Sequence, residues 1–196
     1  MKKHLFCTSL VFIIFLISTN RLIAEGPSVY IQLAADNKTE FCIGDKTVLI
    51  GKCMFDADEF SRHEWKSSSP ELILEKRENM AFLEFKEKGE HKFTYYAWDE
   101  QGRKDSAAIT LTVYDIPNKE VITSRPFFTR LFRKDLPKII EAVDVNADYQ
   151  YKWYKDGNII KEATQPKYKA VEKGRYRLEI TSSNGCKVYS QVIEIK

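Results

Sequence analysis

The chain has 196 residues, of which 43% are hydrophobic and 30% are charged, and its formal net charge is +3. Residues 1–24 hold three basic residues and no acidic one, so the rest of the chain has 28 Lys and Arg against 28 Asp and Glu. A neutral chain of this kind gives no indication of nucleic-acid binding, which depends on an excess of positive charge. The length that remains allows one large domain or two small ones.

The N-terminus has the pattern of a secretory signal peptide. Lysines precede an apolar stretch from Leu5 to Ile17, and the small residue Ala24 follows it. This pattern predicts cleavage after Ala24, and the apolar stretch is shorter than the roughly 20 residues of a membrane span. An uncleaved anchor is the alternative. We therefore predict a protein of the periplasm or the cell surface that is not inserted in the membrane once residues 1–24 are removed.

Strand signals dominate the rest of the chain, and long amphipathic helix patterns are absent. Runs rich in β-branched and aromatic residues occur at 82–85, 93–96, 110–114 and 192–195. Short strands separated by turn residues are typical of β-sandwiches.

A weak internal repeat indicates two domains. In the first half, Trp65 is followed by a Gly-x-x-x-Phe strand from Gly89, by a turn at 99–102 and by a final strand at 108–114. Such self-similarity is expected when one folding unit occurs twice.

The second half repeats this order. Trp153 is followed by an Asp-Gly turn, a Gly-x-Tyr strand from Gly174, a turn at 183–185 and a final strand at 188–195. Pro117 ends the first copy, because proline cannot continue a strand ladder. We predict domains at 25–115 and 119–196, joined by a linker at 116–118.

These motifs carry a resemblance to known families. The second half resembles the Ig-like repeats of secreted Bacteroidota surface proteins, and the first half resembles the polycystic-kidney-disease (PKD) type. The resemblance implies an all-β fold of two tandem immunoglobulin-like β-sandwiches, with Trp65 and Trp153 as core residues on the third strand of each. Such sandwiches are scaffolds for binding and carry no chemistry of their own.

Three cysteines follow the leader, at Cys42, Cys53 and Cys186, and no Cys-x-x-Cys motif is present. Export permits disulfides, and an odd count leaves at least one thiol unpaired in a monomer. The chain direction of the Ig-type fold places Cys42 and Cys186 at the junction of the two domains. We therefore predict a Cys42–Cys186 bridge, with Cys53 free.

Alternation along the strand at 93–98 gives the first candidate surface. If Phe93 and Tyr95 point inward, Tyr96 and Trp98 point outward. Adjacent outward aromatics are candidates for sugar stacking or protein docking. The alternative is that they pack under a loop or against the second domain.

The same alternation predicts a basic face on the second domain. Lys152 and Tyr154 point outward on one strand, and Arg175 and Arg177 point outward on the neighbouring strand. This face could bind an acidic polysaccharide or an acidic protein, or it could be a solvated surface.

The segment at 125–134 combines aromatic residues with four basic ones. It is open to three interpretations, namely a partner-docking edge strand, a loop folded over an open edge, and a first strand that contributes core side chains. Its candidate contact residues are Phe127, Phe128, Arg130, Phe132 and Arg133.

Acidic residues cluster in two loops of the first domain that an Ig-type fold brings to one end. Calcium binds 6–8 oxygen ligands, but no EF-hand spacing is present, so the cluster is a weak candidate beside a solvated acidic rim. We predict no other metal and no cofactor. The cluster consists of Asp56, Asp58, Glu59, Asp99 and Glu100.

No nucleophile motif, phosphate loop or paired metal-type histidine is present, which argues against an enzyme. The residues from 25 to 115 carry 12 basic and 18 acidic residues, whereas those from 116 to 196 carry 16 and 10. This asymmetry and the 125–134 segment predict a protein–protein interaction or adhesion component of a bacterial cell-envelope assembly. The aromatic and basic surfaces predict the alternative, a glycan-binding accessory module at the cell surface. The expected partners are an envelope or surface protein, or a polysaccharide.

Overall fold

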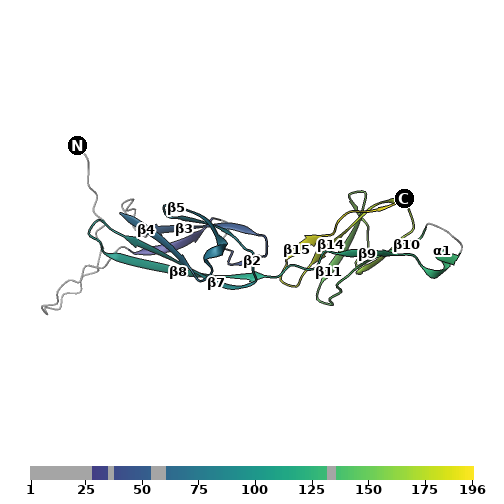
Figure 1. The fold of residues 1–196 in the computed structure, drawn as a ribbon, viewed down its shortest axis with the longest axis horizontal. Helices are drawn as coiled ribbons and strands as arrows, with labels where there is room; N and C mark the ends of the chain where they lie inside the picture. Colours follow the sequence, from purple (N-terminus) through teal and green to yellow (C-terminus); the bar gives the residue numbers. More distant parts are fainter. Residues whose placement is uncertain (1–27, 35–37, 54–60, 132–135) are drawn as a thin grey trace. The chain divides into compact units, whose positions relative to one another are not determined.

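The computed structural model describes residues 28–34, 38–53, 61–131 and 136–196, and the chain divides into two units between Val113 and Tyr114 (Figure 1). The predicted signal peptide lies outside the described residues. The predicted domain limits and linker stay predictions. None of the helices in the described part of the chain is both long and apolar enough to cross a membrane.

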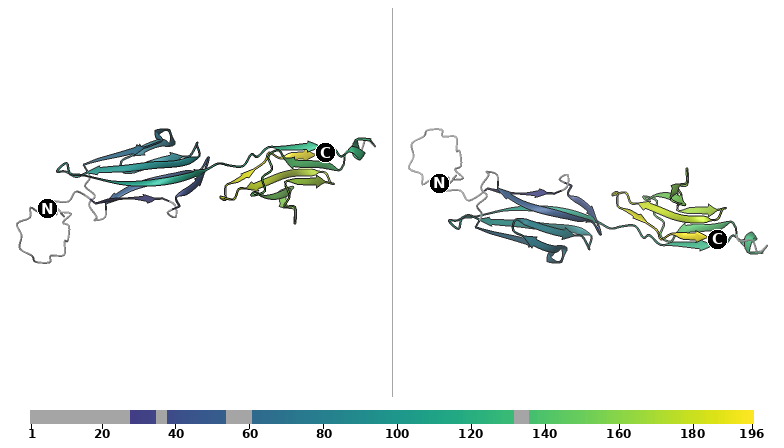
Figure 2. Two further views of the ribbon diagram at one scale, coloured as in Figure 1. Left: turned by 90° about the horizontal axis from the view of Figure 1, so that it is seen from below. Right: turned by 90° about the horizontal axis from the view of Figure 1, so that it is seen from above.

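Unit 1 consists of two four-stranded sheets, with the orders β1-β3-β6-β5 and β2-β8-β7-β4. In immunoglobulin lettering the first sheet is A-B-E-D and the second contains G-F-C, the arrangement of a constant-type sandwich. The two layers are visible in Figure 2. The strands are β1 (Val29–Leu33), β2 (Glu40–Cys42), β3 (Lys46–Cys53), β4 (Arg62–Ser67), β5 (Ile73–Arg77), β6 (Met80–Glu84), β7 (Gly89–Trp98) and β8 (Lys104–Tyr114), with a 3-10 turn η1 (Pro70–Leu72) before β5.

Unit 2 has a three-stranded sheet of order β13-β10-β9 and a second sheet of order β12-β11-β14-β15, in which β16 also pairs with β14. In immunoglobulin lettering the first sheet is E-B-A and the second is C′-C-F-G. A C′ strand also occurs in variable-type domains. The elements are β9 (Val121–Ser124), α1 (Phe127–Leu131), β10 (Lys138–Ala142), β11 (Gln150–Lys155), β12 (Asn158–Ile159), β13 (Lys167–Ala170), β14 (Gly174–Thr181), β15 (Lys187–Tyr189) and β16 (Ile193–Ile195).

The strand orders confirm the predicted fold class: the chain is all-β, with two immunoglobulin-like β-sandwiches. Both tryptophans predicted for the core are buried on the third strand of that lettering, Trp65 at 2% exposure on β4 and Trp153 at 0% on β11. The indole of Trp153 donates a hydrogen bond to the backbone oxygen of Gln165 at 2.9 Å. The indole nitrogen of Trp65 has no hydrogen-bond partner among the described residues.

The start of the F strand is tied down in the same way in both units. The Tyr176 hydroxyl donates to the backbone oxygen of Glu172, four residues upstream, at 2.9 Å. This is the tyrosine corner of immunoglobulin-type sandwiches. In unit 1 the place is taken by His91, whose Nε2 lies 3.1 Å from the oxygen of Glu87. Because a carbonyl only accepts, Nε2 carries the proton, and His91 is the corner residue of unit 1.

The last strand of unit 2 differs from the prediction of one strand over 188–195. It is divided into β15 and β16 because the Ser190 side chain enters the ladder. The Ser190 hydroxyl accepts the Leu178 amide at 2.9 Å and donates to the Gln191 oxygen at 2.8 Å. A side chain therefore takes the place of a backbone acceptor and interrupts the strand.

Candidate binding surfaces

The outer face of the β11-β14-β15 sheet brings the predicted basic residues together. Tyr154 pairs across the strands with Arg177, and Lys152 pairs with Glu179. Lys152, Arg175 and Arg177 are exposed and Tyr154 is half-buried. Inward positions of the same strands, such as Trp153 and Leu178, are fully buried, so the alternation expected from sequence holds.

This face is hollowed by a groove of about 610 Å³ that crosses the C, F and G strands. We call it the Arg–Tyr groove. Two guanidinium groups lie on its central strand, and a tyrosine lies on the strand at either side. It is lined by Tyr154, Asp156, Gly157, Arg175, Arg177, Tyr189 and Val192.

An Asp-Gly turn shapes one end of the groove. Asp156 has φ of 50° and Gly157 has φ of 84°, the left-handed pair that joins neighbouring strands in a tight hairpin. The Asp156 carboxylate accepts the Arg175 amide at 2.8 Å. The turn is therefore fastened to β14 beside the first arginine of the groove.

The two arginines of the groove are held differently. The Arg177 guanidinium lies over the Tyr189 ring, 4.5 Å from its centroid, and its Nε donates to the Ser190 oxygen at 3.1 Å. The Arg175 guanidinium has no hydrogen bond or ion pair to any described residue. Arg177 thus has a fixed orientation, its terminal nitrogens have no hydrogen-bond partner in the described part of the chain, and Arg175 is available there to meet a ligand.

A buried carboxylate, Glu179, lies beside the groove on the same outer face, with 3% of the residue exposed. It accepts the Tyr154 hydroxyl at 2.8 Å and lies 3.2 Å from the Lys187 ammonium and 3.8 Å from that of Lys152. Burial opposes ionisation, but hydrogen bonds from Tyr154 and Tyr189, followed by Lys187, outweigh it and lower the pKa of Glu179.

The pKa values of the neighbouring tyrosines shift in the opposite direction, upward. Their hydrogen bonds to the Glu179 carboxylate raise the pKa of both Tyr154 and Tyr189, since an ionised phenol could not donate to it. The Tyr154 hydroxyl is occupied by its hydrogen bond to Glu179, and the two rings meet edge to face with centroids 6.5 Å apart. Because Arg177 lies over the Tyr189 ring, what remains for a ligand is the ring surface of Tyr154.

The sequence-based prediction missed Glu179 and Tyr189. The alternation that selected Arg175 and Arg177 continues to Glu179, so that signal was present. Tyr189 lies on the last strand and reaches the groove only because β15 pairs with β14, with Tyr189 opposite Glu179. No pattern within its own strand indicates this neighbour.

In unit 1, Tyr96 and Trp98 lie on the outer face of β7, half-buried, with ring centroids 6.3 Å apart. Phe93 and Tyr95 point inward and are fully buried, as predicted. The cross-strand partner of Trp98 is Arg62 on one side and Lys104 on the other, and each places its charge over the ring, at 4.6 and 5.0 Å from the centroid.

Cations thus cover both aromatic rings of unit 1. The Lys104 ammonium is also 4.0 Å from the Tyr96 centroid, and Lys66 approaches the same ring at 5.4 Å. Such contacts contribute roughly 0.5–1 kcal/mol each at exposed sites. A sugar could stack on these rings only after the cationic side chains over them move. The predicted stacking role of Tyr96 and Trp98 therefore stays a prediction.

The described part of this segment, residues 125–131, forms no strand, which corrects the two strand interpretations for these residues. The first strand of unit 2 ends at Ser124, and Pro126 opens the short helix α1, with the Arg130 amide bonded to the Pro126 oxygen at 3.2 Å. Proline suits a helix start, because its fixed φ is helical and its missing N–H is not needed there. Phe127 is 72% exposed and contributes nothing to the core.

Other members of that segment have separate outcomes. Arg130 and Leu131 are exposed on α1. Phe128 belongs to α1, but its side chain lies outside the described residues, as do Phe132 and Arg133. Their roles as contact residues stay predictions.

Of the predicted acidic cluster, only Asp99 and Glu100 lie within the described residues. The Asp99 carboxylate accepts the Arg103 Nε at 2.6 Å and the amides of Gln101 and Arg103 at 3.0 and 2.8 Å. It therefore organises the β7–β8 turn, and Glu100 is exposed. No group of three or more potential metal ligands occurs among the residues with described positions. Asp56, Asp58 and Glu59 lie outside them.

The sulfurs of Cys42 and Cys186 are both disulfide-bonded. Cys42 ends β2, and Cys186 is buried in the turn before β15, where its amide bonds to the Ser182 hydroxyl at 3.1 Å. Their pairing with one another, and Cys53 as a free thiol, stay predictions.

A protease digest of the exported protein without reductant should release one linked peptide pair that contains Cys42 and Cys186. The oxidising environment outside the cytoplasm favours such a bond, and only one thiol is left over. Alkylation before reduction should label Cys53 alone. Mass spectrometry that finds three alkylated cysteines, or a bridge that includes Cys53, would contradict this connectivity.

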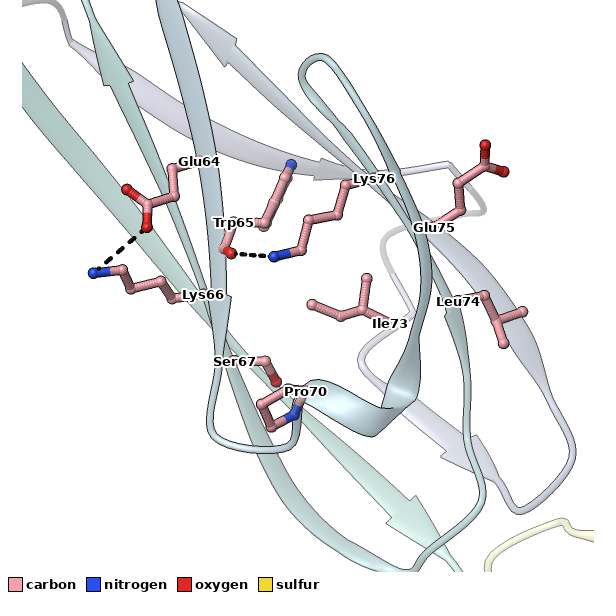
Figure 3. A pocket seen from close by; sticks show the side chains of 9 residues that line it. All are labelled: Glu64, Trp65, Lys66, Ser67, Pro70, Ile73, Leu74, Glu75 and Lys76. Atoms are coloured by element: carbon pink, nitrogen blue, oxygen red, sulfur yellow. Dashed lines mark hydrogen bonds and ion pairs between the residues drawn. The ribbon is translucent and has the colours of Figure 1, made fainter.

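A second hollow, of about 470 Å³, lies at the open edge of unit 1, where β4 and β5 border different sheets (Figure 3). The side chain of Lys76 reaches across from β5, and its ammonium donates to the backbone oxygen of Trp65 at 2.8 Å (Figure 3). An edge carbonyl that already accepts a lysine is less available to a strand of another chain. Lys76 thus protects the β4 edge against unwanted pairing.

No known family model matches this chain, and no curated protein matches it in sequence. Among solved structures, murine CEACAM1b is similar at 9% identity and a TM-score of 0.40, with 86% of this chain and 99% of that chain covered. The fibronectin(III)-like modules of Clostridium thermocellum CbhA are similar at 14% identity and a TM-score of 0.40, with 84% of this chain and 90% of that chain covered. The insect immune protein hemolin is similar at 14% identity and a TM-score of 0.40, with 87% of this chain and 47% of that chain covered. At these scores the likenesses carry no functional argument, and the fold assignment rests on the strand orders.

Proposed function

We propose that this chain is a non-enzymatic binding protein of the periplasm or the cell surface, which attaches to an anionic partner through the Arg–Tyr groove of unit 2. One observation carries the proposal: Arg175 and Arg177, two residues apart on β14, line one hollow together with Tyr154 and Tyr189 from the neighbouring strands. Arginine and tyrosine are the residue types that most often dominate binding energy in interfaces. Arginine also binds carboxylates and phosphates through paired, charge-assisted hydrogen bonds.

The two described histidines support a non-enzymatic role, because each is used by the fold. His91 holds the F-strand corner. His63 Nδ1 lies 2.6 Å from the hydroxyl of the buried Tyr95, and its partial burial lowers its pKa. Neither lies in the Arg–Tyr groove.

The proposal is tested by affinity capture with residues 25–196 from an envelope extract of the source organism. Capture should be reduced at least tenfold by Arg175→Gln, since a hydrogen bond to a charged group contributes about 1.5–3 kcal/mol. Lys169→Gln is the matched control, because it removes one exposed charge from β13 in the opposite sheet. Equal loss in both variants, or in neither, would contradict a specific role of the groove.

A second candidate function is docking to a protein through α1. Phe127 and Leu131 are four residues apart on this helix and are 72% and 62% exposed. Residues at this spacing lie on one helical face and could anchor an apolar contact. This function predicts that Phe127→Ser with Leu131→Ser abolishes capture of a glycosidase-resistant partner, whereas Arg175→Gln leaves it intact.

A further inference from the structure

We infer that the ligand of the Arg–Tyr groove is a polysaccharide that contains uronic acid residues. The inference rests on the proposed function and names the chemistry of the partner at the same site. It follows from what each side chain in the groove still has available after its contacts within the protein are made.

The arginines require an anion. Arg175 and Arg177 are two residues apart on one strand face, so their Cα atoms are about 7 Å apart. Arg177 is fixed by the Tyr189 ring and the Ser190 oxygen, whereas Arg175 is uncommitted among the described residues. A polymer that carries carboxylates on neighbouring residues can use both guanidinium groups at once, one preset and one that adapts.

The tyrosines require a flat apolar face. Tyr154 donates its hydroxyl to Glu179 at 2.8 Å, so this hydroxyl is not available as a polar contact of the ligand. The rings of Tyr154 and Tyr189 border the groove on either side of β14. Because the Arg177 guanidinium lies over the Tyr189 ring, the C–H face of a sugar ring would pack against the Tyr154 ring.

The acceptor in the groove fits the hydroxyls of a sugar. Asp156 lies at the turn end with one carboxylate oxygen on the Arg175 amide. An ionised carboxylate has about four acceptor positions, so it can also receive hydroxyl groups. A uronic acid residue supplies a carboxylate, an apolar ring face and hydroxyl donors together. An acidic peptide supplies carboxylates but no ring face of this kind, so the groove favours the sugar acid.

The test is titration calorimetry of residues 25–196 with three probes: oligogalacturonate, the same oligosaccharide with methyl-esterified carboxyls, and poly-L-glutamate. We expect binding of oligogalacturonate that weakens as salt rises, because exposed charges are screened. The methyl ester, which keeps the rings and loses the charge, should not bind detectably. Arg175→Gln should weaken oligogalacturonate binding at least tenfold, and Lys169→Gln should change it less than twofold.

Three results would overturn the inference. Poly-L-glutamate binding as tightly as oligogalacturonate would make the ligand an acidic peptide. Equal binding of the methyl ester would remove the role of the carboxylate. No binding of any probe would exclude uronic acids of this type, and the capture experiment then separates the two proposals. Capture that still depends on Arg175 would keep the groove as a binding site for another ligand. Capture that does not depend on Arg175 would contradict both the proposed function and the uronic acid inference.

Discussion

Gly51→Ala should lower the free energy of unfolding of unit 1 by about 3 kcal/mol, at the upper end of typical overpacking costs. A Cβ atom at position 51 would lie 2.3 Å from the Tyr95 ring, far inside contact distance. The ring cannot move away, because its hydroxyl is 2.6 Å from His63 Nδ1 and the Trp65 ring packs on it at 4.9 Å. Denaturant unfolding followed by tryptophan fluorescence measures the loss.

Gly44→Ala provides the comparison for this prediction. Gly44 has φ of 93° and no atom within 4 Å of a built Cβ, so its substitution tests backbone strain without a clash. A residue with a side chain in this region costs on the order of 1 kcal/mol. If Gly51→Ala costs no more than Gly44→Ala, the close approach of Tyr95 to the β3 backbone is not a constraint on the fold.

Glu179→Gln should destabilise unit 2 by about 2 kcal/mol at pH 7. Removal of one partner from a fully enclosed ion pair costs about 3–5 kcal/mol. The cost expected for Glu179→Gln is smaller, because the side chains of Lys152 and Lys187 are each 48% exposed. The same variant should weaken oligogalacturonate binding, because the carboxylate orients the Tyr154 ring through its hydrogen bond to the hydroxyl.

The pH dependence of this effect has a defined sign. The pKa of Glu179 is lower in the folded protein than in the unfolded chain, so its stabilisation is complete above the ordinary glutamate value of about 4.3 and is lost as the pH falls through the folded value. The difference between wild type and Glu179→Gln should therefore be largest at neutral pH and should shrink below about pH 4. Denaturant unfolding at both pH values measures it.

Glu172→Gln is the matched control for the carboxylate. Glu172, in the loop before β14, pairs with Lys155, but its side chain is 68% exposed, and exposed pairs contribute little. An equal loss of stability in the two variants, or a Glu179→Gln effect that does not change with pH, would contradict the role assigned to Glu179.

Local patterns were sufficient for much of the architecture. Alternation correctly placed Phe93 and Tyr95 in the core and Tyr96 and Trp98 outside, because side-chain direction along a strand depends only on position. The Asp156–Gly157 turn was predictable because backbone preference is a property of the segment itself, whereas the buried tryptophans were predicted from the resemblance to Ig-type sandwiches.

Local patterns were misleading where a segment could satisfy its backbone in more than one way. The aromatic residues around Phe127 have high strand propensity, yet Pro126 opens a helical turn there, and β9 ends before it. Strand propensity reflects packing against neighbours, and an exposed loop lacks those neighbours. In the last strand, the hydroxyl of Ser190 competed with a backbone acceptor, which no hydrophobic pattern reveals.

The sequence by itself determined the strand-rich character of the chain and the outward basic residues of the second unit, because residue types and alternation are properties of one segment, and the resemblance to Ig-like repeats added the sandwich fold and the core tryptophans. Only the tertiary structure decided which of these residues form a site. The groove exists because β14 pairs with β11 on one side and with β15 on the other, which brings Tyr154, Glu179 and Tyr189 together from three strands. Cross-strand contacts are long-range, and the periodicity of a single strand carries no information about its neighbour.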